Sequence, residues 1–311
     1  MEKLVTTMLQ SGKAGLDLAL YVLLPVLVIM MAVMKVVEAK GLLALVARWM
    51  RPLLKLFGVP GAGAFAILQL LLVSFAAPLA TLAIMERDGT NRRHIAATLA
   101  MVLTMSQANV VFPMVAVGLN LGVIMLTSLV GGFAAAALTY YVFARSLEEK
   151  EARDSFDASA LPEPKGNIMS LMILGGQEAV QVILGAIPML ILAIFLVNLL
   201  KLSGSIGLLE RMLAPLLGRI GFPAVAVLPL ATKYLAGGTA MMGVTLNLLK
   251  EGAITTVELN RMAGFLTNPC DLVGVAVLIS AGARCASVVR PAIAGAVAGI
   301  LLRGVLHLMI F

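Results

Sequence analysis

Charged residues are scarce in this sequence. They make up 13% of the 311 residues, about half the share found in soluble domains. Aromatic residues are also few, at 5%, whereas hydrophobic residues reach 61% before the 29 glycines are counted. Such an aliphatic chain cannot be a soluble domain, a disordered segment or a nucleic-acid-binding domain, despite its net charge of +7. The composition predicts an all-α, polytopic helical membrane protein whose main partner is the lipid bilayer.

Cysteine and histidine are nearly absent too. Cys270 and Cys285 cannot form a disulfide framework, and His94 and His307 lack the clustered partners of a metal site. The sequence contains no P-loop and no nucleophile–base set. We therefore expect no catalytic residues, no resident metal, no cofactor and no nucleic-acid partner. An intramembrane enzyme is the weakest alternative.

Long apolar runs mark the membrane segments. The first, Leu18–Met34, opens at Asp17 and closes at Lys35. It is too long for the apolar part of a signal peptide and no cleavage site follows, so we interpret it as a spanning helix. The other runs are Pro60–Met85, Ile95–Gly118, Leu121–Phe143, Ala179–Leu200, Pro223–Leu249, Leu259–Ala283 and Pro291–Ile310.

The two halves of the chain resemble each other. A shift of 163 residues places Pro25 on Pro188 and Gly41 on Gly204. The same shift matches Arg48 with Arg211, Pro52 with Pro215, Gly58 with Gly221, Pro60 with Pro223, Gly89 with Gly252 and Thr104 with Thr267. Shared prolines and glycines indicate a duplication because they fix backbone geometry. We predict a first repeat at 1–144, a charged cytoplasmic linker at 145–167 and a second repeat at 168–311.

Each half contains the same parts in the same order. After the proline-containing span comes an amphipathic segment, Gly41–Gly58 or Gly204–Gly221, which is typical of a helix lying in the membrane interface. Next comes a long apolar stretch that small residues interrupt, at Ser74–Pro78 or Ala236–Thr239. If these stretches cross the membrane, the repeats are parallel. If they turn back as re-entrant hairpins, the repeats are inverted, and the distribution of Lys and Arg favours this second arrangement.

Two ionisable residues lie deep inside apolar runs. Lys233 and Asp271 are both next to helix breakers, where an ionisable side chain usually faces the protein interior and has a function. A structural ion pair between packed helices is the alternative. Thr267–Asp271 contains Pro269, which predicts an unwound helix, and Thr104–Asn109 is its neutral counterpart. These polar side chains could instead form ordinary hydrogen bonds between helices.

We predict a solute site at the bilayer midplane, between the two repeats. The glycines before Thr239 allow a close approach of the backbone, and Asp271 is the predicted group for coupling to a proton or sodium ion. The predicted binding residues are Thr104, Ser106, Gln107, Asn109, Lys233, Gly237, Gly238, Thr239, Thr267, Asn268 and Asp271.

The starts of the two halves carry short related motifs. They are GKAGLD at Gly12–Asp17 before Pro25, and GGQEA at Gly175–Ala179 before Pro188. With Gly41 and Gly204, these motifs resemble the nucleoside-recognition, or Gate, family of membrane proteins. The chain is similar to spore maturation proteins A and B fused into one, and more distantly to concentrative nucleoside transporters and the membrane part of ferrous-iron transporters. A nucleoside transporter has Gly-Gln-Thr-Glu in a hairpin, whereas Glu178 here follows Gly-Gln directly.

These observations favour a secondary transporter of a small polar solute, either nucleoside-like or another polar or anionic metabolite. The alternative is a non-transporting membrane partner or assembly factor, in which Lys233 and Asp271 touch and no cavity separates the breaks. The expected location is the bacterial inner membrane. The substrate, the coupling ion, the direction of transport and the oligomeric state, including a homo-oligomer, stay open.

Overall fold

The computed structural model describes residues 2–147, 166–203, 218–219 and 221–311, and this part of the chain contains helices and no strands. The prediction of an all-α fold is therefore confirmed. The helices of the first half are α1 (Glu2–Asp17), the π-helix η1 (Leu18–Leu23), α2 (Leu24–Ala39), α3 (Leu42–Leu56), α4 (Gly61–Leu72), α5 (Pro78–Arg87), α6 (Arg92–Thr104), α7 (Ala108–Val115), α8 (Leu121–Leu138) and the π-helix η2 (Thr139–Phe143).

The second half repeats this order of parts. Its helices are α9 (Ile168–Leu202), the 3-10 turn η4 (Ala224–Ala226), α11 (Val227–Ala236), α12 (Gly238–Lys250), α13 (Thr256–Leu266), α14 (Leu272–Ile279), α15 (Ala283–Ser287) and α16 (Val289–Ile310). Among the described residues, five helices are long and apolar enough to cross a bilayer: Glu2–Ala39, Arg92–Val115, Leu121–Phe143, Ile168–Leu196 and Val289–Ile310. The chain is a multi-pass membrane protein.

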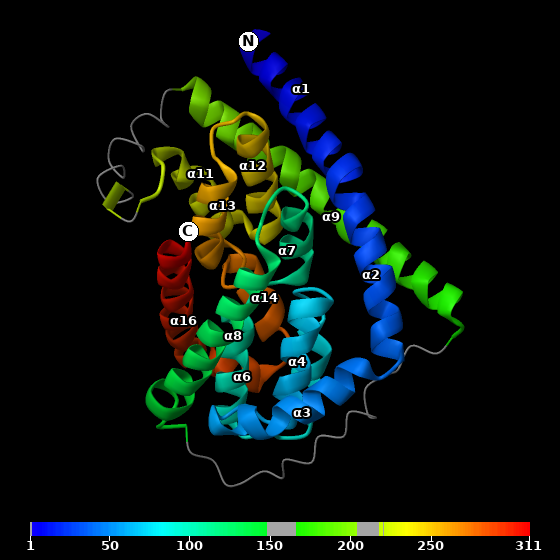
Figure 1. Cartoon of the computed structure of the whole chain (residues 1–311), viewed down its shortest axis with the longest axis vertical. Helices are drawn as coiled ribbons and strands as arrows, with labels where there is room; N and C mark the ends of the chain where they lie inside the picture. Colours follow the sequence, from blue (N-terminus) through cyan, green and yellow to red (C-terminus); the bar gives the residue numbers. More distant parts are fainter. Residues whose placement is uncertain (1, 148–165, 204–217, 220) are drawn as a thin grey trace.

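The first spanning helix is longer than the sequence suggested. α1, η1 and α2 form one helix over Glu2–Ala39, whereas the apolar run began only at Leu18. Polar residues such as Lys13 and Asp17 limit the apolar run, but no helix breaker interrupts the backbone here. Pro25 lies in the first turn of α2, directly after the π-helix. In Figure 1 this long helix crosses α9 at the side of the molecule, and α2 packs along α9.

The predicted amphipathic segment of the first half is confirmed as a helix with one exposed apolar face. On α3, Leu54 is fully buried, whereas Trp49 is 80% exposed. α3 and α4 are bent by 116° relative to each other across Phe57–Pro60. This geometry fits a helix lying in the membrane interface before the chain turns inward. The matching segment of the second half, Gly204–Gly221, falls largely outside the described residues.

The third part of each half is a helical hairpin. α4 has 12 residues and α5 has 10, so neither can cross a bilayer alone, and the two pack against each other. α11 and α12 form the corresponding pair, joined at Gly237. If the hairpins turn back, the first half keeps three crossings, Glu2–Ala39, Arg92–Val115 and Leu121–Phe143. The described part of the second half has two long crossings, Ile168–Leu196 and Val289–Ile310, and the broken helix α13–α14 between them makes the third. An odd number of crossings gives the halves opposite orientations, which supports inverted repeats. The repeat boundaries themselves stay a prediction.

The core that positions the site is formed by the discontinuous helices and the last helix of each half. α16 packs closely along α6, α8 and α13. Glycines permit this, because a Cβ on Gly299 would lie only 2.5 Å from the carbonyl oxygen of Gly131. The backbones of α8 and α16 are therefore in direct contact, along a packing face of small residues that contains Gly295 and Gly299.

Candidate functional site

The two unwound segments meet in the middle of the protein. α6 ends at Thr104 and α7 begins at Ala108, while α13 ends at Leu266 and α14 begins at Leu272. The backbone N–H of Gln107 donates to the carbonyl oxygen of Thr267 at 3.0 Å. The amide Nε2 of Gln107 donates to the carbonyl oxygen of Asn268 at 3.1 Å. Each break thus satisfies backbone groups that the other break leaves free.

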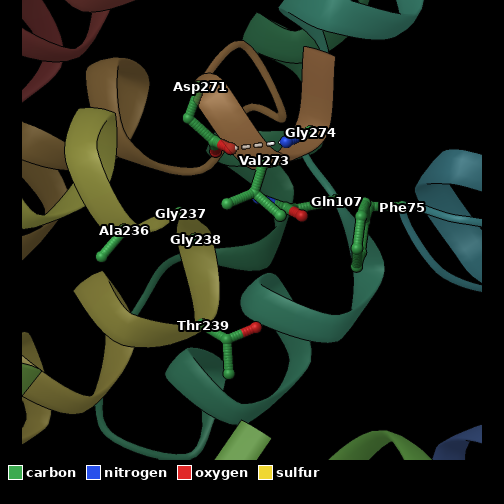
Figure 2. Close-up of a pocket in the computed structure, with 9 residues that line it drawn as sticks. All are labelled: Phe75, Gln107, Ala236, Gly237, Gly238, Thr239, Asp271, Val273 and Gly274. Atoms are coloured by element: carbon green, nitrogen blue, oxygen red, sulfur yellow. Dashed lines mark hydrogen bonds between the residues drawn. The ribbon is translucent and has the colours of Figure 1, made fainter. Parts of the chain in front are cut away.

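A small cavity of about 50 Å³ lies beside this junction. Figure 2 shows that Gln107 reaches it from one break and Asp271 from the other, with Phe75 from the tip of the first hairpin. The tip of the second hairpin forms another wall. The lining residues are Phe75, Gln107, Ala236, Gly237, Gly238, Thr239, Asp271, Val273 and Gly274. A cavity of this size accommodates a few water molecules and is smaller than a drug-sized ligand needs.

Lys233 and Asp271 form a buried ion pair in which Lys233 Nζ donates to Asp271 Oδ2. Both side chains are almost completely shielded from solvent. The other oxygen, Asp271 Oδ1, accepts from the backbone N–H of Gly274 at 2.7 Å and so caps the start of α14. A direct contact fits both the assembly-factor alternative and a transporter whose site is empty, whereas the adjoining cavity is what the transporter predicted.

The structure divides the predicted residues into two neighbouring groups. Gln107, Gly237, Gly238, Thr239 and Asp271 line the cavity, and Lys233 touches it through Asp271. The remaining predicted residues hold the two breaks together.

Asn109 Oδ1 accepts from the backbone N–H of Phe75 at 3.3 Å, which ties α7 to the first hairpin. Asn268 folds back on its own break, donating to Phe265 O at 2.8 Å and accepting from Cys270 N at 3.0 Å. Thr104, Ser106 and Thr267 lie on the opposite side of the junction, around an arginine. These five side chains hold the unwound segments and do not line the cavity.

The sequence analysis missed that arginine. Arg303 on α16 is fully buried and donates to Ser106 Oγ at 2.6 Å and Thr267 Oγ1 at 2.9 Å. One turn further along, His307 is also buried, between Thr127 Oγ1 at 2.9 Å and the carbonyl oxygen of Asn260 at 2.6 Å. A signal was present: residues 295, 299, 303 and 307 recur every four positions, so both side chains continue the glycine packing face.

Glu178 lies away from the cavity. In α9 it pairs with Lys35 of α2, with Lys35 Nζ 2.5 Å from Glu178 Oε1. This pair joins α2 to α9 and is partly exposed. The Gly-Gln-Glu sequence therefore joins peripheral helices in this chain and does not lie in a hairpin.

We expect Gly238→Ala to disturb the cavity wall. An added Cβ would lie 2.3 Å from Gln107 Nε2, so the amide must move and lose its hydrogen bond to Asn268. Loss of one such bond lowers the free energy of unfolding by about 1 kcal/mol. The matched control is Gly185→Ala in α9, which meets nothing within 4 Å and should stabilise the helix by up to about 1 kcal/mol. Thermal unfolding of purified protein measures both, and equal shifts would contradict the assignment.

Comparisons with known proteins agree with this geometry. Residues 20–122 match the family model for Gate, nucleoside recognition. This match covers about a third of the chain. The predicted resemblance to the Gate family is thereby confirmed, whereas the likeness to spore maturation proteins stays a prediction. No significant match was found among curated proteins.

Solved structures show that the fold extends over the whole chain. A double-substitution variant of the transporter CNTnw in an outward-facing state matches with a TM-score of 0.70 and 17% identity, covering 99% of this chain and 84% of that one. CNTnw in an inward-facing, substrate-bound state matches with a TM-score of 0.66 and 20% identity, over 99% and 83%. A variant in an intermediate state gives 0.68 and 18%, over 99% and 85%. The chain therefore has the fold of the CNTnw structures.

Proposed function

We propose that the chain is a secondary transporter of a small polar solute of the nucleoside type. The observation that carries this proposal is the position of the cavity, which both hairpin tips and both helix breaks line. Discontinuous helices that meet at a repeat interface are the usual construction of a transporter site. The Gate domain and the CNTnw fold support the nucleoside type of solute.

The chemistry of the lining fits such a solute. Phe75 offers an apolar ring face, while Gln107, Thr239 and Asp271 offer an amide, a hydroxyl and a carboxylate. An aromatic face stacks on a planar base, and the polar groups hydrogen-bond hydroxyls or ring nitrogens. Because the cavity has a volume of only about 50 Å³, a hairpin tip must move outward before a nucleoside can bind. Gly237, with φ of +88° at the turn of the second hairpin, is a suitable pivot.

Asp271 is the group that we propose for coupling. Its carboxylate lines the cavity and pairs with Lys233 at the same time. Protonation of Asp271, or a sodium ion bound there, weakens that pair and changes the cavity wall that it forms with α14. A charged group buried at membrane depth is suited to this role. We place the protein in the bacterial inner membrane.

Uptake of radiolabelled nucleosides into proteoliposomes tests the proposal. We expect Thr239→Val to reduce uptake up to about tenfold, because the hydroxyl that faces the cavity contributes one hydrogen bond to the solute. The matched control is Thr232→Val, since Thr232 lies on the same hairpin and bonds its own helix at Leu228 O. It should transport normally. Wild-type uptake no greater than that of empty liposomes, for nucleosides and for other small polar solutes, would refute transport and favour the assembly factor.

A further inference from the structure

Arg303 lies where the two discontinuous helices end. Its Nη1 donates to the carbonyl oxygen of Thr104, the last residue of α6. Its Nη2 donates to Thr267 Oγ1, in the residue directly after α13. Thr104 and Thr267 are equivalent positions of the two repeats, so one side chain from α16 contacts the same point of both.

The surrounding electrostatics favour a positive charge at this point. The C-terminal end of a helix carries a partial negative charge, and two such ends, of α6 and α13, converge here. Within the part of the chain that the structure describes, no carboxylate lies within the 4 Å of an ion pair with Arg303. Within the described residues, the fully buried guanidinium contacts a helix-end carbonyl and two hydroxyls, while its Nε has no hydrogen-bond partner.

The hydroxyl groups also orient toward a cation. Ser128 donates to Ser106 Oγ at 2.7 Å, Ser106 Oγ lies 2.8 Å from Thr267 Oγ1, and Thr267 donates to Ala263 O at 2.9 Å. Ser128 thus donates to Ser106, Ser106 to Thr267, and Thr267 to a backbone carbonyl, so the hydroxyl hydrogens of Ser106 and Thr267 point away from the arginine. The oxygen lone pairs of Ser106 and Thr267 face the guanidinium, together with the carbonyl oxygen of Thr104. Carbonyl and hydroxyl oxygens at helix C-terminal ends are the groups that bind coupling cations in transporters.

We propose that Thr104 O, Ser106 Oγ and Thr267 Oγ1 form a monovalent cation site that the guanidinium of Arg303 permanently occupies. Arg303 is thus a positioning residue. It neutralises both helix ends and fixes Gln107 and Asn268, which directly follow Ser106 and Thr267 at the junction beside the cavity. Because the guanidinium already neutralises both helix ends, no mobile cation needs to bind there. Removal of the Arg303 side chain should leave the helix ends in need of a bound cation.

Chemical rescue tests the cation site. Arg303→Ala leaves space for a free guanidinium ion, and we expect its melting temperature to fall by about 5 °C or more. Guanidinium chloride at millimolar concentration, far below its denaturing range, should restore at least half of the loss with saturation. Urea is the matched neutral probe of the same shape and should restore nothing. A folded Arg303→Ala protein that responds equally to guanidinium and urea would overturn the proposal.

A second pair of variants covers the case in which Arg303→Ala does not fold. Arg303→Lys keeps the charge, whereas Arg303→Met keeps the length and apolar volume. We expect the lysine variant to be the more stable of the two, since the site favours a cation. A methionine variant that is equally or more stable shows instead that the position needs only filling, and it overturns the proposal.

The uptake measurement extends the test to function and rests on the proposed transport. In proteoliposomes, nucleoside uptake by Arg303→Ala should be low and should recover with guanidinium. The melting experiment needs no solute, so failure of the proposed transport leaves it intact. Restored stability without any wild-type uptake would uphold the cation site and refute the transporter. Restored stability without restored uptake, where the wild type transports, would overturn the positioning role.

Discussion

Lys233→Met is expected to lower the free energy of unfolding by about 3–5 kcal/mol, because it leaves the carboxylate of Asp271 buried without its cation. The pair is almost completely shielded from solvent, so water cannot replace the lost partner. Asp271 keeps its hydrogen bond from Gly274, but this one bond does not balance a full charge. Thermal unfolding of the purified protein in detergent measures the change.

The double variant Lys233→Met with Asp271→Asn distinguishes an ion pair from simple packing. Asparagine retains the cap on α14, and methionine fills much of the volume of lysine, so no buried charge remains. We expect most of the lost stability to return while nucleoside uptake stays absent, since the proposed coupling carboxylate is gone. A double variant no more stable than Lys233→Met would contradict this account.

The peripheral ion pair supplies a matched control. Lys35 and Glu178 also pair one lysine with one carboxylate, but their side chains are 16% and 37% exposed. Lys35→Met should therefore cost at most about 1 kcal/mol. It should leave uptake unchanged, because this pair joins α2 to α9 away from the cavity.

The breaks and hairpins could be predicted from the sequence because their cause is local. Pro269 cannot donate a backbone hydrogen bond, and Gly237 adopts a positive φ that other residues rarely adopt. Such residues interrupt a helix wherever it packs, and their recurrence after a fixed shift indicated the duplication. The depth of Lys233 and Asp271 within apolar runs likewise identified two side chains that the structure brings into contact.

Other features depend on contacts that one sequence does not contain. Arg303 lies in the second half of the apolar run Pro291–Ile310, so from the sequence it could equally have been an anchor at the membrane surface. Its burial follows from the close packing of α16 against α8 and α6, which brings it to the breaks. The start of the first helix was placed too late for a related reason. An apolar run shows which residues can face lipid. It does not show where the helix begins, because the backbone stays helical through polar residues such as Asp17.

Gly299→Leu is expected to prevent α8 and α16 from packing and to lower the free energy of unfolding by more than about 3 kcal/mol, at the upper end of overpacking effects. Even the first added carbon would lie 2.5 Å from the carbonyl oxygen of Gly131, 2.8 Å from Ala135 Cβ and 2.8 Å from Thr104 Cγ2. Two of these neighbours belong to α8 and one to α6, so the strain cannot be relieved by a single side chain. Yield of monodisperse protein and its melting temperature measure the effect.

Gly185→Leu on α9 is the matched control, since a Cβ there meets nothing within 4 Å and the variant should fold normally. A Gly299→Leu protein with the wild-type melting temperature would contradict the packing. The milder Gly299→Ala links this packing to the site, because Gly299 and Arg303 are one turn apart on α16. If the helices separate slightly, the guanidinium moves away from Thr104 and Thr267 together. Nucleoside uptake by Gly299→Ala should then fall by more than the loss of folded protein accounts for. The reason is that the two breaks lose their contacts with the Arg303 guanidinium, which fix their relative position.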